Sequence, residues 1–270
     1  MKISKNKQTI GILGILTVSL IALTACAPSS VSASSDNPKL IAVENVTNEN
    51  ESLTQLDLTS VDEEGTTMIN DESLDEALTQ IASGGLTQQE MDGLLFMREE
   101  EKLAHDVYVT LYEIWGLPIF QNIAQSEQTH TDAVLKLINQ YGLDDPAATT
   151  GIGEFVNPAL QNLYTQLVAQ GSQSLVDALK VGGAIEEIDI LDLEQHIAET
   201  ENDAIILVYQ NLLKGSRNHL RAFVSTLENR AGDTYLPQYL SSEVLDGIMS
   251  AGIESGGNRN GQNRNQGKGS

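Results

Sequence analysis

Hydrophobic residues between positions 86 and 254 recur every three or four residues, which is the spacing of one face of an α-helix. No convincing alternation of period two interrupts this pattern. The pattern predicts four long helices, at roughly 88–115, 118–141, 172–197 and 203–229. It also predicts shorter helices at about 158–171 and 241–251. We therefore expect an all-α domain over 86–254.

The residues at the helix ends support these boundaries. Thr87 and Glu90 have the spacing of a capping box, while Gly116 and Pro118 suit the end of one helix and the start of the next. The first two long helices are thus joined by a short link, as are the last two, and a long connection separates the pairs. This order predicts a four-helix bundle with one long crossover.

Two ionisable residues stand inside the apolar face of the helix at 118–141. That face carries, in order, Phe120, Ile123, Glu127, His130, Val134, Leu137 and Tyr141. Burying a carboxylate and an imidazole costs several kcal/mol unless a partner compensates them. Because Glu127 and His130 lie one turn apart, they can face a single metal ion.

The other three long helices also place polar residues on their apolar faces. Glu101 lies at the centre of the first face, and Glu186 lies on the third with Glu187 beside it, so either is a candidate there. On the fourth face, His219 takes the place that His130 has on the second, and Ser216 takes the place of Glu127. The candidate metal ligands are Glu101, Glu127, His130, Glu186, Glu187 and His219. Oxygen and imidazole donors of this kind suit iron or manganese.

These motifs resemble the ferritin-like superfamily, in which two helices each contribute a Glu and two each contribute Glu-x-x-His. Glu101 with Tyr108 is similar to the first-helix motif of rubrerythrins and ferritins. The segment 98–108 together with 215–219 resembles an uncharacterised branch, domain-of-unknown-function family 2202. The resemblance implies a ferritin-like four-helix bundle with a metal centre. Ser216 departs from the pattern, because Glu is expected at that position.

Several side chains near the predicted site have two interpretations. Tyr108 and Trp115 share the face of Glu101, either as groups that orient ligands or as core packing. Gly182 and Gly183 indicate close packing, room for a ligand or a kink. His105 lies off the apolar face and is expected at the surface or as a partner of another residue, and His196 is expected at the surface.

The two ends of the chain predict export and a lipid anchor. Residues 1–25 combine an early basic segment with a short apolar stretch, as in a signal peptide. They run into Cys26 through a sequence that resembles a lipoprotein lipidation site. Residues 26–85 are polar and acidic and predict a disordered linker, with Leu53–Leu58 and Leu74–Ile81 as possible docking helices. The tail 255–270 is of low complexity.

The net charge of −23 argues against binding to nucleic acid, whose phosphates require a basic surface. We therefore expect an exported, lipid-anchored protein that binds iron or manganese in the bundle core, with peroxide reduction or ferrous oxidation as its activities. Its expected partners are metal ions and, through lipid on Cys26, the membrane. The alternative is a metal-free helical lipoprotein that serves as a surface adaptor, in which buried Glu and His form a hydrogen-bonded network.

Overall fold

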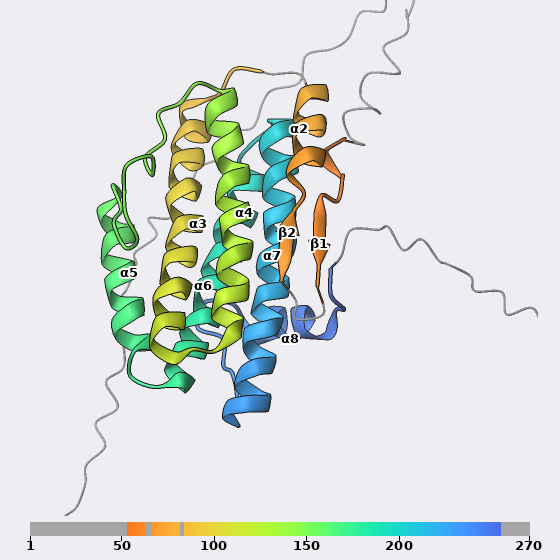
Figure 1. The fold of residues 1–270 in the computed structure, drawn as a ribbon. Coiled ribbons are helices and arrows are strands. Elements are labelled where there is room, and N and C mark those ends of the chain that lie inside the picture. Colours follow the sequence, from red (N-terminus) through yellow and green to blue (C-terminus); the bar gives the residue numbers. More distant parts are fainter. Residues whose placement is uncertain (1–52, 63–65, 82–83, 255–270) are drawn as a thin grey trace, which may run out of the picture. The chain divides into compact units, whose positions relative to one another are not determined.

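The computed structural model of the protein describes residues 53–62, 66–81 and 84–254 (Figure 1). The predicted signal segment, Cys26 and the C-terminal tail all lie outside these residues. Among the residues that are described, no helix is both long and apolar enough to cross a bilayer.

The described part of the chain is mostly helical, as the periodicity predicts. The helices are α2 (Asp71–Gln80), α3 (Gln88–Trp115), α4 (Pro118–Gln140), α5 (Pro158–Gly171), α6 (Leu175–Ala198), α7 (Asp203–Thr226) and α8 (Ser242–Ser250). From α3 onward each corresponds to a predicted helix within a few residues.

Local side-chain chemistry accounts for the helix ends. Thr87 and Glu90 form the predicted capping box, and Gly116 ends α3 in the left-handed conformation with φ of 62°. Helix α6 begins three residues later than predicted, because the Ser174 side chain accepts a hydrogen bond from the backbone N–H of Asp177. Helix α7 ends at Thr226 and continues as a short π-helix, Leu227–Ala231.

The four long helices pack as two neighbouring pairs. Helix α3 makes its largest contact with α4, and α6 makes its largest contact with α7. Figure 1 shows all four running side by side, with α5 against α3. Helix α5 belongs to the long connection between α4 and α6, and it packs on both α3 and α6.

The described part of the segment before α3 corrects the expectation of a disordered linker over 26–85, of which residues 26–52 lie outside the described residues. Strands β1 (Thr59–Val61) and β2 (Thr67–Ile69) pair antiparallel, and α2 follows them. Leu58, Ile69 and Leu74 are buried, and the strand β2 packs on α4 and α7. The segment is ordered because it buries apolar side chains on the helices, a gain that its polar composition does not reveal. The helix expected at Leu74–Ile81 is present in α2, which begins three residues earlier, at Asp71, and ends at Gln80.

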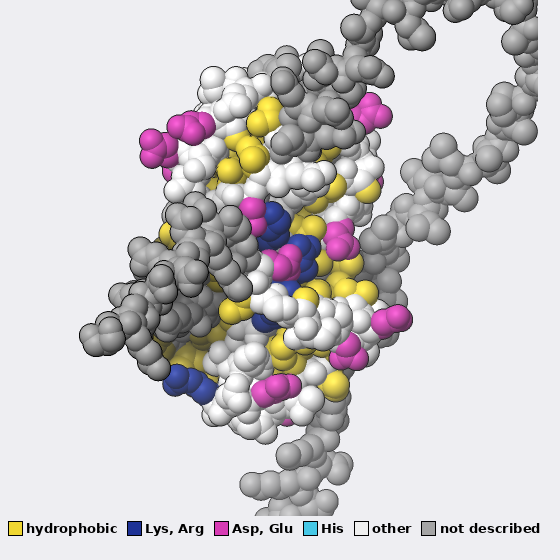
Figure 2. All heavy atoms as spheres, turned by 90° about the vertical axis from the view of Figure 1, so that its right-hand side faces the viewer, with side chains coloured by type: hydrophobic (Ala, Val, Ile, Leu, Met, Phe, Trp, Pro, Cys, Tyr) yellow, Lys and Arg dark blue, Asp and Glu magenta, His cyan; other side chains and the backbone are white. Residues whose placement is uncertain are grey.

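The face shown in Figure 2 mixes hydrophobic and acidic side chains with a group of basic ones near its middle. Basic side chains of α7 are tied to segments outside the long helices. Arg217 and Arg221 both pair with Glu254, and Lys214 pairs with Asp57. These ion pairs fasten the N-terminal hairpin segment and the end of the described chain to α7.

The apolar core consists of two clusters. One contains Tyr108, Phe120 and Phe223, and the other contains Met97, Leu137 and Leu212. On α3, α4 and α7 the stretches between the clusters contain buried polar side chains, among them Glu101, Glu127, His130, Ser216 and His219. A buried polar layer therefore lies between the two apolar clusters.

Candidate metal centre

The polar layer is formed by side chains from all four long helices. Its members are Glu101 on α3, Glu127 and His130 on α4, Glu186 and Asp189 on α6, and Ser216 and His219 on α7. None is more than 5% exposed. The helical periodicity that predicted these faces thus brings Glu101, Glu127, His130, Glu186 and His219 together.

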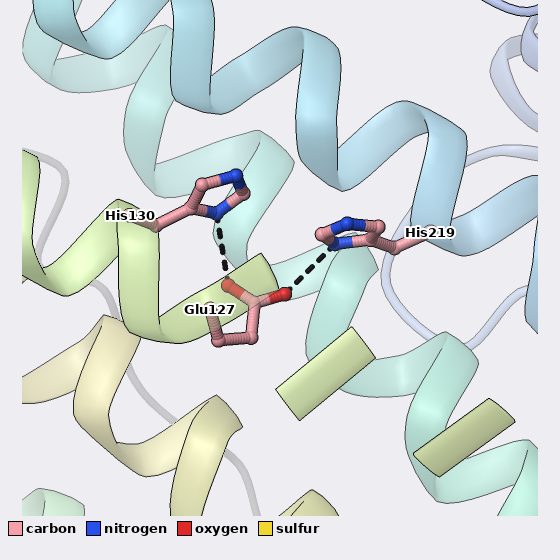
Figure 3. Close-up of side chains that lie close together, drawn as sticks. All are labelled: Glu127, His130 and His219. Atoms are coloured by element: carbon pink, nitrogen blue, oxygen red, sulfur yellow. Dashed lines mark hydrogen bonds and ion pairs between the residues drawn. The ribbon is translucent and has the colours of Figure 1, made fainter. Parts of the chain in front are cut away.

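Glu127 lies between the two histidines (Figure 3). Its Oε2 is 2.9 Å from Nδ1 of His130, and its Oε1 is 2.8 Å from Nδ1 of His219. The two imidazole rings are stacked with centroids 5.4 Å apart. One ligand atom from each of the three residues lies within 4.8 Å of the others, so this group could hold a metal ion.

Two further carboxylates approach the same histidines. Oε2 of Glu101 is 3.4 Å from Nδ1 of His130, and Oε2 of Glu186 is 3.5 Å from Nδ1 of His219. Each imidazole therefore has one close and one more distant carboxylate. The arrangement comprises three carboxylates and two Nδ1 atoms directed toward one region.

The hydrogen bonds around His219 determine its tautomer. The Ser126 hydroxyl donates to the backbone carbonyl of Thr67, which can only accept. Nε2 of His219, 2.8 Å from the same hydroxyl oxygen, must then donate to it. In the neutral imidazole this leaves Nδ1 without a proton and free to ligate, as an outer hydrogen bond does for metal-binding histidines. Strand β2 thus orients a ligand.

Tyr108 orients Glu186 by a hydrogen bond, as Ser126 orients His219. Its hydroxyl donates to Oε1 of Glu186 at 2.5 Å, so the predicted interpretation of Tyr108 as an orienting group is supported. Trp115 instead donates its Nε1 to the backbone carbonyl of Gly171, 2.9 Å away, and packs the end of α3 against α5.

Several atoms of the layer have no hydrogen-bond partner among the described residues. They are both carboxylate oxygens of Glu101, Oε1 of Glu127, Nδ1 of His219, Nε2 of His130 and Oδ1 of Asp189. The short contact between Glu127 and His219 is an ion pair without hydrogen-bond geometry. Each unsatisfied buried polar group costs about 1–3 kcal/mol. A cation bound between Glu127, His130 and His219 would offset that cost at Oε1 of Glu127 and Nδ1 of His219, so these residues fit a metal.

Burial and mutual charge shift the pKa values of the layer in opposite directions. Burial raises the pKa of Glu101 to about 8, an effect that His130 opposes. Burial works against the ionised form of Glu127 too, but its two histidine neighbours outweigh this and lower its pKa. Burial disfavours the imidazolium of His219, yet Glu127 and Glu186 raise its pKa to about 9. Near neutral pH and without a metal, these pKa shifts favour an imidazolium at His219, an ionised Glu127 and a protonated Glu101.

Glu187 is not part of the centre, which corrects its inclusion among the candidate ligands. Its carboxylate accepts hydrogen bonds from the Tyr235 hydroxyl at 2.6 Å and from backbone N–H groups of Gln238, Tyr239 and Leu240. Successive residues of a helix point about 100° apart, so Glu186 faces the layer while Glu187 faces this loop. Glu186 is therefore the ligand candidate on α6.

Asp189 also belongs to the layer, although it was not among the candidate ligands predicted from the sequence. It is buried on α6, and it accepts a hydrogen bond from the hydroxyl of Ser216. Position 216 of α7 carries serine instead of the expected glutamate, and Asp189 of α6 places a carboxylate next to it. Glu186 and Asp189 have the same three-residue spacing as Glu127 and His130, and that spacing is the signal by which Asp189 could have been found.

The remaining predicted features lie outside the centre or support it by packing. A Cβ at Gly182 would stand 2.5 Å from the Phe223 ring, and one at Gly183 would stand 2.6 Å from the Tyr235 ring, so both glycines allow close packing. His105 pairs with Asp106 at 2.8 Å, and His196 is half-buried rather than exposed.

Comparison with known proteins gives one family and one close relative. The family model described as "Uncharacterized protein domain (DUF2202)" matches residues 90–252. The uncharacterized protein MJ0754 of Methanocaldococcus jannaschii is 52% identical over 176 residues, which are 65% of this chain and 95% of that protein. The crystal structure of hypothetical protein MJ0754 superposes with a TM-score of 0.63 at 52% identity, covering 65% of this chain and 99% of that one.

Proposed function

The chain belongs to the DUF2202 family, and from its buried polar layer we propose that it is a ferritin-like metalloprotein that binds iron or manganese. Glu127, His130 and His219 would hold the ion, with Glu101 and Glu186 as additional carboxylate ligands. The observation that carries this proposal is the set of buried donor atoms in the layer that have no hydrogen-bond partner among the described residues.

The chemistry of the donors supports the choice of metal. Carboxylate oxygen and imidazole nitrogen suit iron and manganese, whereas thiolate-binding metals would need cysteine. The described residues contain none, since Cys26 is the single cysteine of the chain and lies outside them. The pairing of α3 with α4 and of α6 with α7 across a long connection is also the arrangement of ferritin-like bundles.

Ser216 makes the proposed centre asymmetric. A symmetric two-metal centre of this type has a Glu-x-x-His pair on two helices, and α7 offers Ser216 with His219 instead. Asp189 places a carboxylate beside Ser216, but from α6 and engaged with its hydroxyl. We therefore propose one firmly held ion and a weaker second position.

Bound iron or manganese would supply redox chemistry toward peroxide or ferrous ion. The protein would contribute a buried layer between two apolar clusters, which keeps bulk water away from the ligands. Tyr108 would hold Glu186 in orientation, and Ser126 would hold the Nδ1 of His219 toward the ion. The predicted lipid on Cys26 would tether this domain to a membrane of the cell envelope after export.

Metal content tests the proposal. The full chain, purified in detergent, is loaded anaerobically with ferrous iron or manganese, desalted and analysed for metal per chain. A Glu127→Ala/His130→Ala double variant removes two of the three central ligands, and His105→Ala is the control outside the centre. We expect at least one ion per chain in the parent and the control and nearly none in the double variant. A folded parent without metal would reject the proposal.

One observation favours the metal-free alternative, a helical lipoprotein that acts as a surface adaptor. Glu127 already has an imidazole on each side, and this network could fix the register of α4 against α7 without a metal. The two functions differ in their response to chelators. A bound metal stabilises the fold by mass action, so chelation lowers the melting temperature, whereas the network alone is insensitive to it.

A further inference from the structure

A row of acidic residues on α6 leads away from the metal centre. Glu186, Asp189 and Asp192 follow one another at intervals of three residues. Three residues advance about 4.5 Å along a helix and turn about 300°, so successive members of the row lie about 60° apart around the helix axis. Exposure changes accordingly, from 1% for Glu186 and 5% for Asp189 to half-buried for Asp192. The row therefore connects the buried layer with the surface.

Glu100 on α3 completes this row from the opposite side. It is 5% exposed, and its carboxyl group lies close enough to Asp192 and Asp189 for their charges to raise its pKa. Glu100 and Asp189 both line a small cavity of about 10 Å³, which is about the space that one water molecule needs. The rest of the cavity is apolar, lined by Leu103, Ala104, Leu163, Ile185 and Ile188.

The carboxylates at this cavity have unused oxygens. Oε2 of Glu100 and Oδ1 of Asp189 are buried and have no hydrogen-bond partner among the described residues. Burial and the neighbouring carboxylates of Asp192 and Asp189 raise the pKa of Glu100, which reflects how close these groups lie. Burying carboxylates with unsatisfied oxygens around an otherwise apolar cavity costs stability, because those oxygens lose their hydration. A passing cation would benefit from all of them.

We propose that Asp192, Glu100 and Asp189 form a transfer path by which a hard divalent cation moves from solvent to the Glu127–His130–His219 centre. The inference rests on the proposed metal-binding function. Each carboxylate replaces part of the hydration shell of the ion and passes it to the next one. Glu101, whose two oxygens have no hydrogen-bond partner among the described residues, receives the ion at the inner end beside His130.

The path differs from a storage site in its geometry. Within the described residues, the group whose ligand atoms all lie within 4.8 Å of one another is Glu127, His130 and His219. The carboxylates of the path do not belong to this group, and we propose that they contact the ion one after another. A residue that acts in this way lowers the barrier to entry and the barrier to exit equally. Its removal slows uptake and release by the same factor and leaves Kd unchanged.

Manganese exchange kinetics test this inference on the full chain. Uptake of Mn²⁺ is followed by the loss of the free-ion electron paramagnetic resonance signal, and release is followed after mixing the loaded protein with a chelator. Asp192→Asn and Glu100→Gln are compared with the parent. Glu194→Gln is the matched control, because it removes one charge from an exposed position of the same helix. Thermal unfolding of each variant establishes that it is folded.

We expect uptake and release to slow by about tenfold in Asp192→Asn and Glu100→Gln, with Kd and the number of ions per chain unchanged. The Glu194→Gln control should match the parent. Unchanged rates in both path variants would overturn the inference while leaving the metal centre intact. A lower stoichiometry in Glu100→Gln would also overturn it, because Glu100 would then be a ligand. A parent that takes up no Mn²⁺ would instead reject the proposed function.

Discussion

Gly215 on α7 lies directly against the imidazole of His130 on α4. A Cβ at position 215 would stand 2.5 Å from Cε1 and 2.6 Å from Nε2 of that ring. Real side chains do not approach so closely, so the absence of a side chain at Gly215 allows His130 to face Glu127. The position of a metal ligand on one helix thus depends on a glycine of another.

Replacing Gly215 by alanine should therefore displace His130. We expect the affinity for Mn²⁺ to fall by about tenfold or more, the size of effect that follows from disturbing the support of a ligand. Overpacking should also cost about 1–3 kcal/mol of stability, partly offset by the helix propensity of alanine. Isothermal titration and denaturant unfolding measure the two effects.

Gly247→Ala is the matched control for this substitution. Gly247 lies in α8, and a Cβ there would meet no atom within 4 Å. The control should bind Mn²⁺ like the parent and be equally or slightly more stable. Unchanged affinity in Gly215→Ala would show that the ring of His130 adjusts without loss of ligation.

Tyr108→Phe removes the hydroxyl that donates to Glu186. Because such outer hydrogen bonds fix the orientation of a ligand, we expect the metal affinity to fall by about 10-fold to 100-fold with the fold retained. Tyr164→Phe is the control, since its hydroxyl bonds to Thr110 away from the centre at 2.9 Å. Equal affinities in the two variants would assign Tyr108 to core packing alone.

Glu186→Gln and Glu187→Gln should affect different properties, metal binding and stability respectively, although the two residues are adjacent. The first should weaken metal binding, because Glu186 faces the histidine layer. The second should leave binding unchanged but reduce stability by about 2 kcal/mol, because an amide replaces a carboxylate that accepts several hydrogen bonds from the 235–240 loop. Metal titration and urea unfolding of both variants decide the assignment, and the reverse pattern would contradict it.

The pKa values of the centre predict how the stability of the metal-free protein depends on pH. His219 has a pKa of about 9 in the folded protein and Glu101 a pKa of about 8, both above their ordinary values. The folded protein then binds more protons than the unfolded chain, so its free energy of unfolding should decrease as the pH rises from about 6.5 to 9. Urea unfolding of chelator-treated protein across this range measures the trend.

Metal loading should change this dependence. Ligation requires neutral imidazole and ionised carboxylate, so binding releases protons and the affinity for Mn²⁺ should increase with pH over the same range. Titration in two buffers with different ionisation enthalpies counts the released protons. A metal-free protein whose stability rises between pH 6.5 and 9 would contradict the assigned protonation states.

Periodicity along the chain was sufficient to predict the helices and the face that each one buries. The spacing of Glu127 and His130 places both on one side of a helix whatever that helix packs against. Glu101 and His219 were identified in the same way, from their position in an apolar face. These are properties of single helices, and a local pattern determines them.

Relationships between helices were decided by the tertiary structure. Adjacent acids at 186 and 187 are almost equivalent in the sequence, and the packing of α6 between α7 and the 235–240 loop separates their roles. The pairing of Asp189 with Ser216 depends on the rotation and axial offset of α6 against α7. The β1–β2 hairpin is likewise folded because its strand β2 packs on α4 and α7, which its own sequence does not indicate. Sequence alone determined which side chains of the long helices lie on their apolar faces, whereas the partners of those side chains were set by interhelical packing, which depends on the shapes of both surfaces.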